Sequence, residues 1–95
     1  MDKKLKAKWV KALRSGGFKQ TTDTLYKERE DAYCCLGVLC RMAGASVNEI
    51  SGVTMPTHTR FAHIIDPVVA GKLADLNDDC EMPFEMIAGF VQENL

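Results

Sequence analysis

The first fifteen residues mix apolar and basic side chains with the period of a helix. Four apolar residues recur at i, i+4, i+7 and i+8, the spacing that places side chains on one face of an α-helix. They are Leu5, Trp9, Ala12 and Leu13. The opposite side carries three lysines, Lys4, Lys8 and Lys11. We therefore predict an amphipathic helix over residues 2–15 that a pair of glycines ends, with Trp9 anchored in the core.

Residues 18–29 have no helical period. They contain two short extended pieces, 18–20 and 25–27, on either side of a polar turn, and this pattern predicts a β-hairpin. A two-stranded hairpin is only marginally stable alone, so it must lie against the helices or gain a third strand. Polar and apolar side chains alternate over residues 60–64, which makes this segment the best candidate for that strand.

Residues 31–43 are apolar almost throughout, and Arg41 is the one charged side chain after the start of the segment. A helix that is apolar on nearly every side is buried by neighbours on nearly every side. We therefore predict that this segment is the central helix, with Asp31 or Glu30 as its N-cap. Gly37 costs about 1 kcal/mol of helix propensity relative to alanine. We expect a second backbone to cross closely at this glycine.

Two more helices are predicted in the second half of the chain. Asp66 is a suitable N-cap, and Pro67 fits the first helical position because its missing N–H is not needed there. Pro83 opens a last helix, whose apolar residues again follow the helical spacing. Residues 46–59 show no sustained period.

These elements predict one α+β domain over residues 1–95, mostly helical. We expect about four helices around the buried central helix (about 31–43) and a small antiparallel sheet of two or three strands. The length of 95 residues is typical of a single domain. We find neither an apolar run near the roughly 18 residues of a membrane span nor a signal peptide. We therefore expect no membrane association and a cytoplasmic location.

The net charge of −1 hides an uneven distribution. Residues 1–19 hold seven basic side chains against one acidic, and residues 66–95 hold one basic against seven acidic. The basic end is a candidate surface for an acidic partner. Alternatively, the two ends complement each other, within one fold or between copies in a homo-oligomer. Nucleic acid is a less suitable partner, because the interleaved aromatic residues of such modules are missing. The candidate binding residues are Lys4, Lys8, Lys11, Arg14, Arg41 and Arg60.

Four cysteines invite metal or thiol chemistry: Cys34, Cys35, Cys40 and Cys80. This content is too low for a disulfide scaffold. A zinc site would need several of these cysteines together with His58 or His63. However, the two-residue gap of ordinary zinc knuckles is missing, and a helix spreads the cysteines over different faces. We therefore predict no metal site and no cofactor.

A reactive thiol is a second possibility for these cysteines. Cys34 lies in the first turns of the predicted helix, on the same side as Arg41, and is the cysteine best placed to be exposed and reactive. With His58 or His63 it would form the pair used by papain-like cysteine hydrolases. These three residues are weak catalytic candidates. The interpretation that we favour is that most of the cysteines are small buried apolar side chains and that the protein is not an enzyme.

Three strings of residues carry a resemblance to a known group of proteins. They are Trp9-Val10-Lys11-Ala12-Leu13-Arg14-Ser15-Gly16, Cys34-Cys35-Leu36-Gly37-Val38-Leu39-Cys40 and Leu76-Asn77-Asp78. In this order the chain resembles a family of small, functionally uncharacterised proteins common in bacteriophage genomes and prophages. The resemblance implies no catalytic residues. It implies a context in which small accessory proteins block a host factor or sequester a signalling molecule of host defence.

We therefore predict a non-enzymatic phage accessory protein that binds a host protein in the host cytoplasm, for example as an inhibitor of host defence. The first alternative is a protein that binds a small nucleotide signal in a pocket lined by the basic first helix at an oligomer interface. The second alternative is a cysteine hydrolase that uses Cys34. The function is expected on the basic face of the first helix or in residues 46–59.

Overall fold

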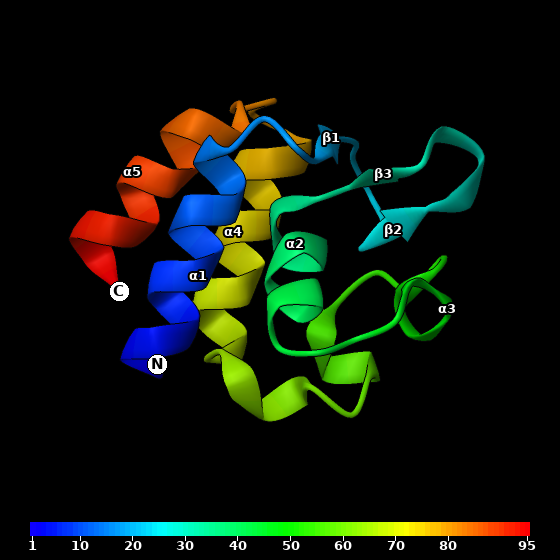
Figure 1. Cartoon of the computed structure of the whole chain (residues 1–95), viewed down its shortest axis with the longest axis horizontal. Helices are drawn as coiled ribbons and strands as arrows, with labels where there is room; N and C mark the ends of the chain where they lie inside the picture. Colours follow the sequence, from blue (N-terminus) through cyan, green and yellow to red (C-terminus); the bar gives the residue numbers. More distant parts are fainter.

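Five α-helices and one three-stranded sheet make up the fold in the computed structural model, which describes residues 1–95 (Figure 1). The helices are α1 (Lys3–Arg14), α2 (Cys35–Met42), α3 (Val47–Ile50), α4 (Pro67–Asp78) and α5 (Phe84–Asn94). The strands are β1 (Lys19–Gln20), β2 (Tyr26–Lys27) and β3 (Ala32–Tyr33). Short 3-10 turns cover Glu28–Glu30, Pro56–His58 and Ala62–Ile64. The predicted α+β class with a helical majority is confirmed.

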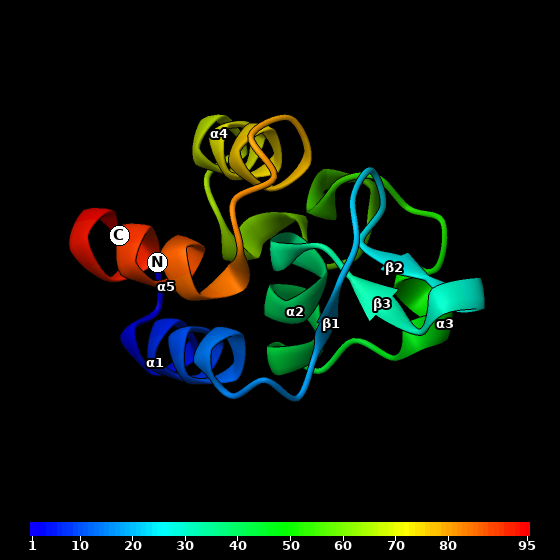
Figure 2. The same cartoon turned by 90° about the horizontal axis from the view of Figure 1, so that it is seen from above.

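Helix α2 lies at the centre of the molecule, as predicted. Helices α1, α4 and α5 lie to one side of it, and the sheet and α3 lie to the other (Figures 1 and 2). All six residues from Cys35 to Cys40 are buried. Trp9 of α1 is also fully buried, and its indole N–H donates a 2.9 Å hydrogen bond to the carbonyl oxygen of Cys35. The apolar face of the first helix therefore packs on the central helix.

The start predicted for the central helix is wrong by four residues. Ala32 and Tyr33 form β3, and α2 begins at Cys35 with Cys34 as its N-cap. Asp31 has a left-handed backbone, at φ 50°, and caps nothing in α2. The aromatic ring of Tyr33 packs at 4.7 Å from that of Tyr26 across the sheet. Strand pairing and this contact override the helical pattern of the sequence here.

The sheet is mixed rather than antiparallel, and its strand order is β1-β3-β2. β1 runs parallel to β3, with Lys19 opposite Ala32, and β2 runs antiparallel to it, with Tyr26 opposite Tyr33. The predicted hairpin between residues 18–20 and 25–27 is therefore wrong, because β3 lies between those two strands. The sequence hides this arrangement because β3 looks like part of the helix that follows.

Residues 60–64 do not supply the third strand either. They form a turn with a 3-10 segment, in which Phe61 and Ile65 are buried four residues apart. A strand would place His63 on the same face as these two buried residues, whereas His63 is exposed.

The backbone crossing expected at Gly37 is confirmed. A Cβ atom at this position would collide with the backbone of Leu25, its carbonyl oxygen first. The same carbonyl oxygen accepts a 3.3 Å hydrogen bond from the N–H of Cys34. The segment before β2 therefore lies directly on the first turn of α2, and only a glycine leaves room for it.

A fully buried side chain, Asn77 at the end of α4, joins three elements. Its Oδ1 accepts hydrogen bonds from the backbone N–H of Cys35, at 3.1 Å, and from Nε2 of Gln20, at 3.0 Å. Its Nδ2 donates to the carbonyl oxygen of Thr21 at 2.9 Å. The side chain of Cys34 makes no capping hydrogen bond, so an amide from another helix satisfies the first N–H of α2 instead.

Gln20 extends this network to the last helix. Its Nε2 also donates to the carbonyl oxygen of Met82 at 2.8 Å, and its Oε1 accepts from the N–H of Phe84, the first residue of α5, at 3.1 Å. The starts of α4 and α5 agree with the prediction. Asp66 accepts hydrogen bonds from the N–H groups of Val68 and Val69, and α5 follows Pro83.

Candidate binding groove

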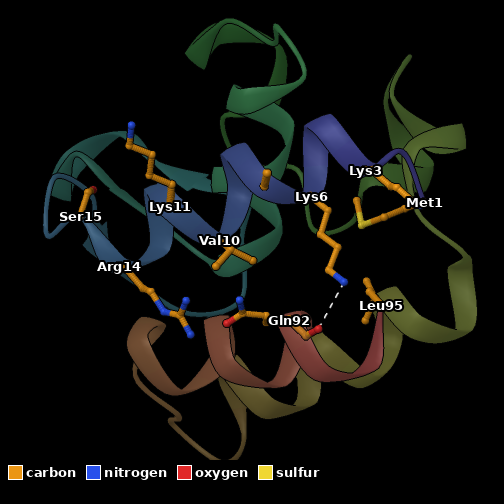
Figure 3. Close-up of a pocket in the computed structure, with 10 residues that line it drawn as sticks. Met1, Lys3, Lys6, Val10, Lys11, Arg14, Ser15, Gln92 and Leu95 are labelled. Carbon is orange, nitrogen blue, oxygen red and sulfur yellow. Dashed lines mark hydrogen bonds between the residues drawn. The ribbon is translucent and has the colours of Figure 1, made fainter.

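An open groove of about 880 Å³ runs between α1 and α5 (Figure 3). Most of its lining comes from a single face of α1, which repeats at i, i+3, i+4, i+7, i+8 and i+11. These residues are Lys3, Lys6, Ala7, Val10, Lys11 and Arg14. Gln92 and Leu95 line the groove from the side of α5, and Met1 closes one end. The groove therefore follows α1 over its whole length.

The groove has an apolar floor and a basic rim. Val10, which is 8% exposed, forms the floor, and the exposed Ala7 lines the groove beside it. Lys6 and Arg14 reach toward α5 (Figure 3). Nζ of Lys6 lies 3.3 Å from the carbonyl oxygen of Gln92, one of the last four carbonyls of α5, which have no partner within the helix. No carboxylate side chain lines the groove.

The opposite charges of the two chain ends do not neutralise each other through direct contacts. The structure contains two ion pairs, Lys27 with Glu30 and Arg60 with Glu49. Neither ion pair joins residues 1–19 to residues 66–95. The expectation that the ends complement each other within one fold therefore fails at the level of ion pairs. No cation of α1 is paired with a carboxylate, and Lys6 alone of them donates a hydrogen bond, to the carbonyl oxygen of Gln92.

The predicted binding residues separate into three groups. Lys11 and Arg14 line the groove, whereas Lys4 and Lys8 are exposed on another flank of α1. Lys3 and Lys6 line the groove and were missed by the sequence analysis. The signal that could have found them is the repeat of Lys3, Lys6, Ala7 and Val10, a second helical stripe beside the core stripe.

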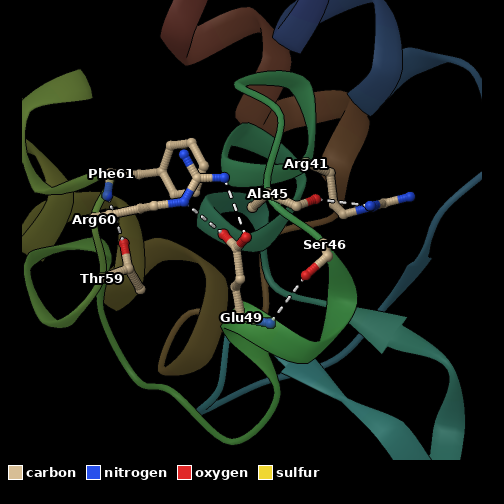
Figure 4. A network of polar contacts seen from close by, with 7 residues as sticks. All are labelled: Arg41, Ala45, Ser46, Glu49, Thr59, Arg60 and Phe61. Atoms are coloured by element: carbon tan, nitrogen blue, oxygen red, sulfur yellow. Dashed lines mark hydrogen bonds and ion pairs between the residues drawn. The ribbon is translucent and has the colours of Figure 1, made fainter.

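Arg41 and Arg60 form the third group, far along the chain from α1, and both already have partners (Figure 4). The guanidinium of Arg60 donates two 3.1 Å hydrogen bonds to the carboxylate of Glu49 and lies 4.2 Å from the centroid of the Phe61 ring. Nη1 of Arg41 donates at 2.7 Å to the carbonyl oxygen of Ala45. The contact of Arg41 links Ala45 to the end of α2, and the contact of Arg60 joins the two ends of residues 49–60, which include most of the irregular stretch 46–59.

The expectation that Cys34 is exposed and reactive is wrong. Its residue is 5% exposed, and burial raises the pKa of its thiol to about 11. Burial likewise raises the pKa of Cys40 to about 12 and that of Cys35 well above its ordinary value. Because burial disfavours the charged thiolate, these three thiols stay protonated at neutral pH. Cys80, just beyond α4, is exposed.

The two histidines lie at the surface. Nδ1 of His58 is 3.5 Å from Oγ1 of Thr54, and His63 makes no side-chain hydrogen bond. Neither histidine is hydrogen-bonded to Cys34. No three His, Cys, Asp or Glu side chains come together in a group that could hold a metal ion.

Residues 1–68 match a family described as a domain of unknown function, DUF8296. The chain belongs to the DUF8296 family. Neither the curated proteins nor the solved structures contain a match to it. The matched residues of the DUF8296 domain include the whole basic wall of the groove, α1, whereas the opposite wall, α5, follows the matched region. None of the helices combines the length and the apolar character needed to cross a bilayer.

Proposed function

We propose that this DUF8296 protein is a non-enzymatic phage accessory protein, which binds an acidic segment of a host protein in the α1–α5 groove, in the host cytoplasm. The observation that carries the proposal is the groove itself, with four cations around an apolar floor and no carboxylate. Such a surface attracts an anionic partner at long range and offers it apolar contact area at short range. Inhibition of a host defence factor is one form that this binding would take.

The chemistry of the rest of the molecule supports binding over catalysis. A cysteine hydrolase needs a thiolate within reach of its substrate. Cys34 is buried with a raised pKa, and it has no histidine partner. The buried cysteines therefore serve as apolar core residues, and the one open concave surface of substantial volume is the groove.

A small nucleotide signal is the second candidate ligand, because the volume of the groove lies in the range of small-molecule sites. Lysine and arginine side chains would suit its phosphate groups. However, no aromatic side chain lines the groove to stack on a base, and the groove is open along its length. A protein segment fits this long, open shape better.

Affinity capture from host lysate tests the proposal. The wild-type chain is compared with Lys3→Glu/Arg14→Glu, which reverses two charges in the groove, and with Lys4→Glu/Lys8→Glu, which makes the same change in net charge on another flank of α1. We expect a stoichiometric host protein with the wild type and the flank variant, and its loss with the groove variant. Capture that is equal in all three would contradict the proposal. A retained nucleotide in native mass spectra would favour the second candidate.

A further inference from the structure

We infer that the segment bound in the groove is an amphipathic helix of about three turns, apolar in its middle and acidic near both ends. This inference rests on the proposed function and specifies the shape and chemistry of the partner. It follows from the length of the groove, from the two helices that form its walls and from the order of charged and apolar residues along it.

The walls of the groove favour a helix as the occupant. α1 and α5 lie side by side and run in opposite directions (Figures 2 and 3). The groove follows α1 from Lys3 to Arg14 and is completed on the α5 side by Gln92 and Leu95, so it forms a trough along α1. From Lys3 to Arg14 this trough is about 16 Å long, at 1.5 Å per residue, which corresponds to three turns of a partner helix. A helix seated on a helix pair buries its apolar face along the trough, the usual mode of helix-in-groove recognition.

The order of side chains along α1 specifies the chemistry of the occupant. Lys3 and Lys6 come first, Ala7 and Val10 occupy the middle, and Lys11 and Arg14 follow. The cations thus form a pair at each end of an apolar section. A partner helix that matches this order carries carboxylates near both of its ends and apolar residues between them, at i and i+3 or i+4.

The experiment uses the full chain and a designed, end-capped 14-residue peptide with two Glu residues near each end and Leu residues on one face of its middle turns. Its binding is measured by fluorescence anisotropy. We expect Lys3→Glu/Arg14→Glu to weaken binding by about tenfold or more, because two attractive contacts become repulsive. The matched Lys4→Glu/Lys8→Glu should stay within about twofold. If charge reversal impairs folding, Lys3→Gln/Arg14→Gln replaces it.

Two control peptides separate shape from charge. One has the same composition in a scrambled order that spreads the Leu residues around the helix, and the other has Gln in place of every Glu. Both should bind at least about fivefold more weakly than the designed peptide. Equal binding of the scrambled peptide, or an equal loss in the groove and flank variants, would overturn the inference.

The inference and the proposed function can fail separately. If a host protein is captured through the groove but the designed peptide does not bind, the acidic helix is wrong and the proposed function stands. If the peptide binds in the groove but no host protein depends on it, the inference stands and the proposed function fails.

Discussion

Single residues in this molecule hold separate elements together, and Asn77 does so with one amide. It accepts from the N–H of Cys35 and from Nε2 of Gln20 and donates to the carbonyl oxygen of Thr21, so it fixes the start of α2 against β1 and the residue that follows it. Both of these backbone groups are buried, so they cannot form hydrogen bonds with water instead. Asn77 and Cys35 belong to two of the strings singled out in the sequence, whereas Gln20 and Thr21 lie outside them.

Replacement of the buried amide should be costly. Asn77→Ala leaves the N–H of Cys35, the carbonyl of Thr21 and one donor contact of Gln20 without their partner. We expect a loss of about 3 kcal/mol in the free energy of unfolding, measured by urea denaturation. The exposed Asn48→Ala is the control and should change it by less than about 0.5 kcal/mol. A loss no larger for Asn77 than for Asn48 would refute the capping role.

Two glycine-to-alanine substitutions should change the stability of the fold in opposite directions. Gly37→Ala places a methyl group against the carbonyl of Leu25, so it should destabilise the fold by about 2 kcal/mol despite its better helix propensity. Gly71→Ala, in the middle of α4, meets no atom within 4 Å and should stabilise by up to about 1 kcal/mol. The melting temperatures of both variants are compared with that of the wild type. A change in the same direction for both would contradict the close crossing at Leu25.

The stability of the fold should decrease at alkaline pH, because buried thiols and a tyrosine hydroxyl are protonated in the folded state. Burial raises the pKa of Cys34 to about 11, and the hydrogen bond to Asp31 raises that of Tyr26 to about 12, from ordinary values of 9.0 and 10.0. At a pH between the ordinary and the raised pKa of each group, the group is ionised in the unfolded chain and still protonated in the folded one. The stabilisation is therefore complete below pH 9 and lost as pH rises through the folded pKa values.

Urea denaturation at several values between pH 8 and pH 11.5 measures this effect. A Cys34→Ala/Cys40→Ala variant should show a shallower decline than the wild type, because two of the raised thiol pKa values are absent. A free energy of unfolding that stays constant across this range in the wild type would show that the thiols are not buried as described.

At the scale of elements, the sequence predicts helices well and strands badly. In α1, α4 and α5 the helical repeat of apolar residues is long enough to be recognised in the sequence. The continuous apolar run of α2 is equally clear. β3 is two residues long and adjoins α2, so Ala32 and Tyr33 look like its first turn. The sequence predicts only part of the groove. Lys11 and Arg14 were among the candidate binding residues, whereas Lys3 and Lys6 join the groove because of where α5 docks.

The segment around α3 shows what a surface ion pair contributes. Two hydrogen bonds join Arg60 to Glu49, but the side chain of Arg60 is 65% exposed. Arg60→Ala should therefore cost less than about 1 kcal/mol in unfolding experiments and leave partner binding unchanged. The charge-swapped double variant, Arg60→Glu/Glu49→Arg, should recover most of any loss. A large drop in partner capture with Arg60→Ala would instead assign Arg60 to a binding surface.

At the scale of the whole molecule, the family match and the folding unit do not coincide. The match ends at residue 68, within the first turn of α4. α4 supplies Asn77, which satisfies the start of α2, and α5 buries Ile87, Ala88 and Val91 in the same core. Residues 1–68 alone would therefore leave the central helix without α4 and the first helix without α5.

A chain truncated after residue 68 should consequently fail to fold. Removal of α4 and α5 exposes fully buried side chains such as Trp9 and Leu39 to water and leaves the N–H of Cys35 without its acceptor, and a domain this small has little stability to spare. We expect no cooperative thermal transition by circular dichroism and poorly dispersed amide NMR signals. The full chain, measured in parallel, should show a cooperative transition and well-dispersed amide signals. A cooperative transition in the truncated chain would mean that α1, the sheet and α2 form a core of their own. The groove between α1 and α5 would then be a junction of two folding units rather than a surface of one.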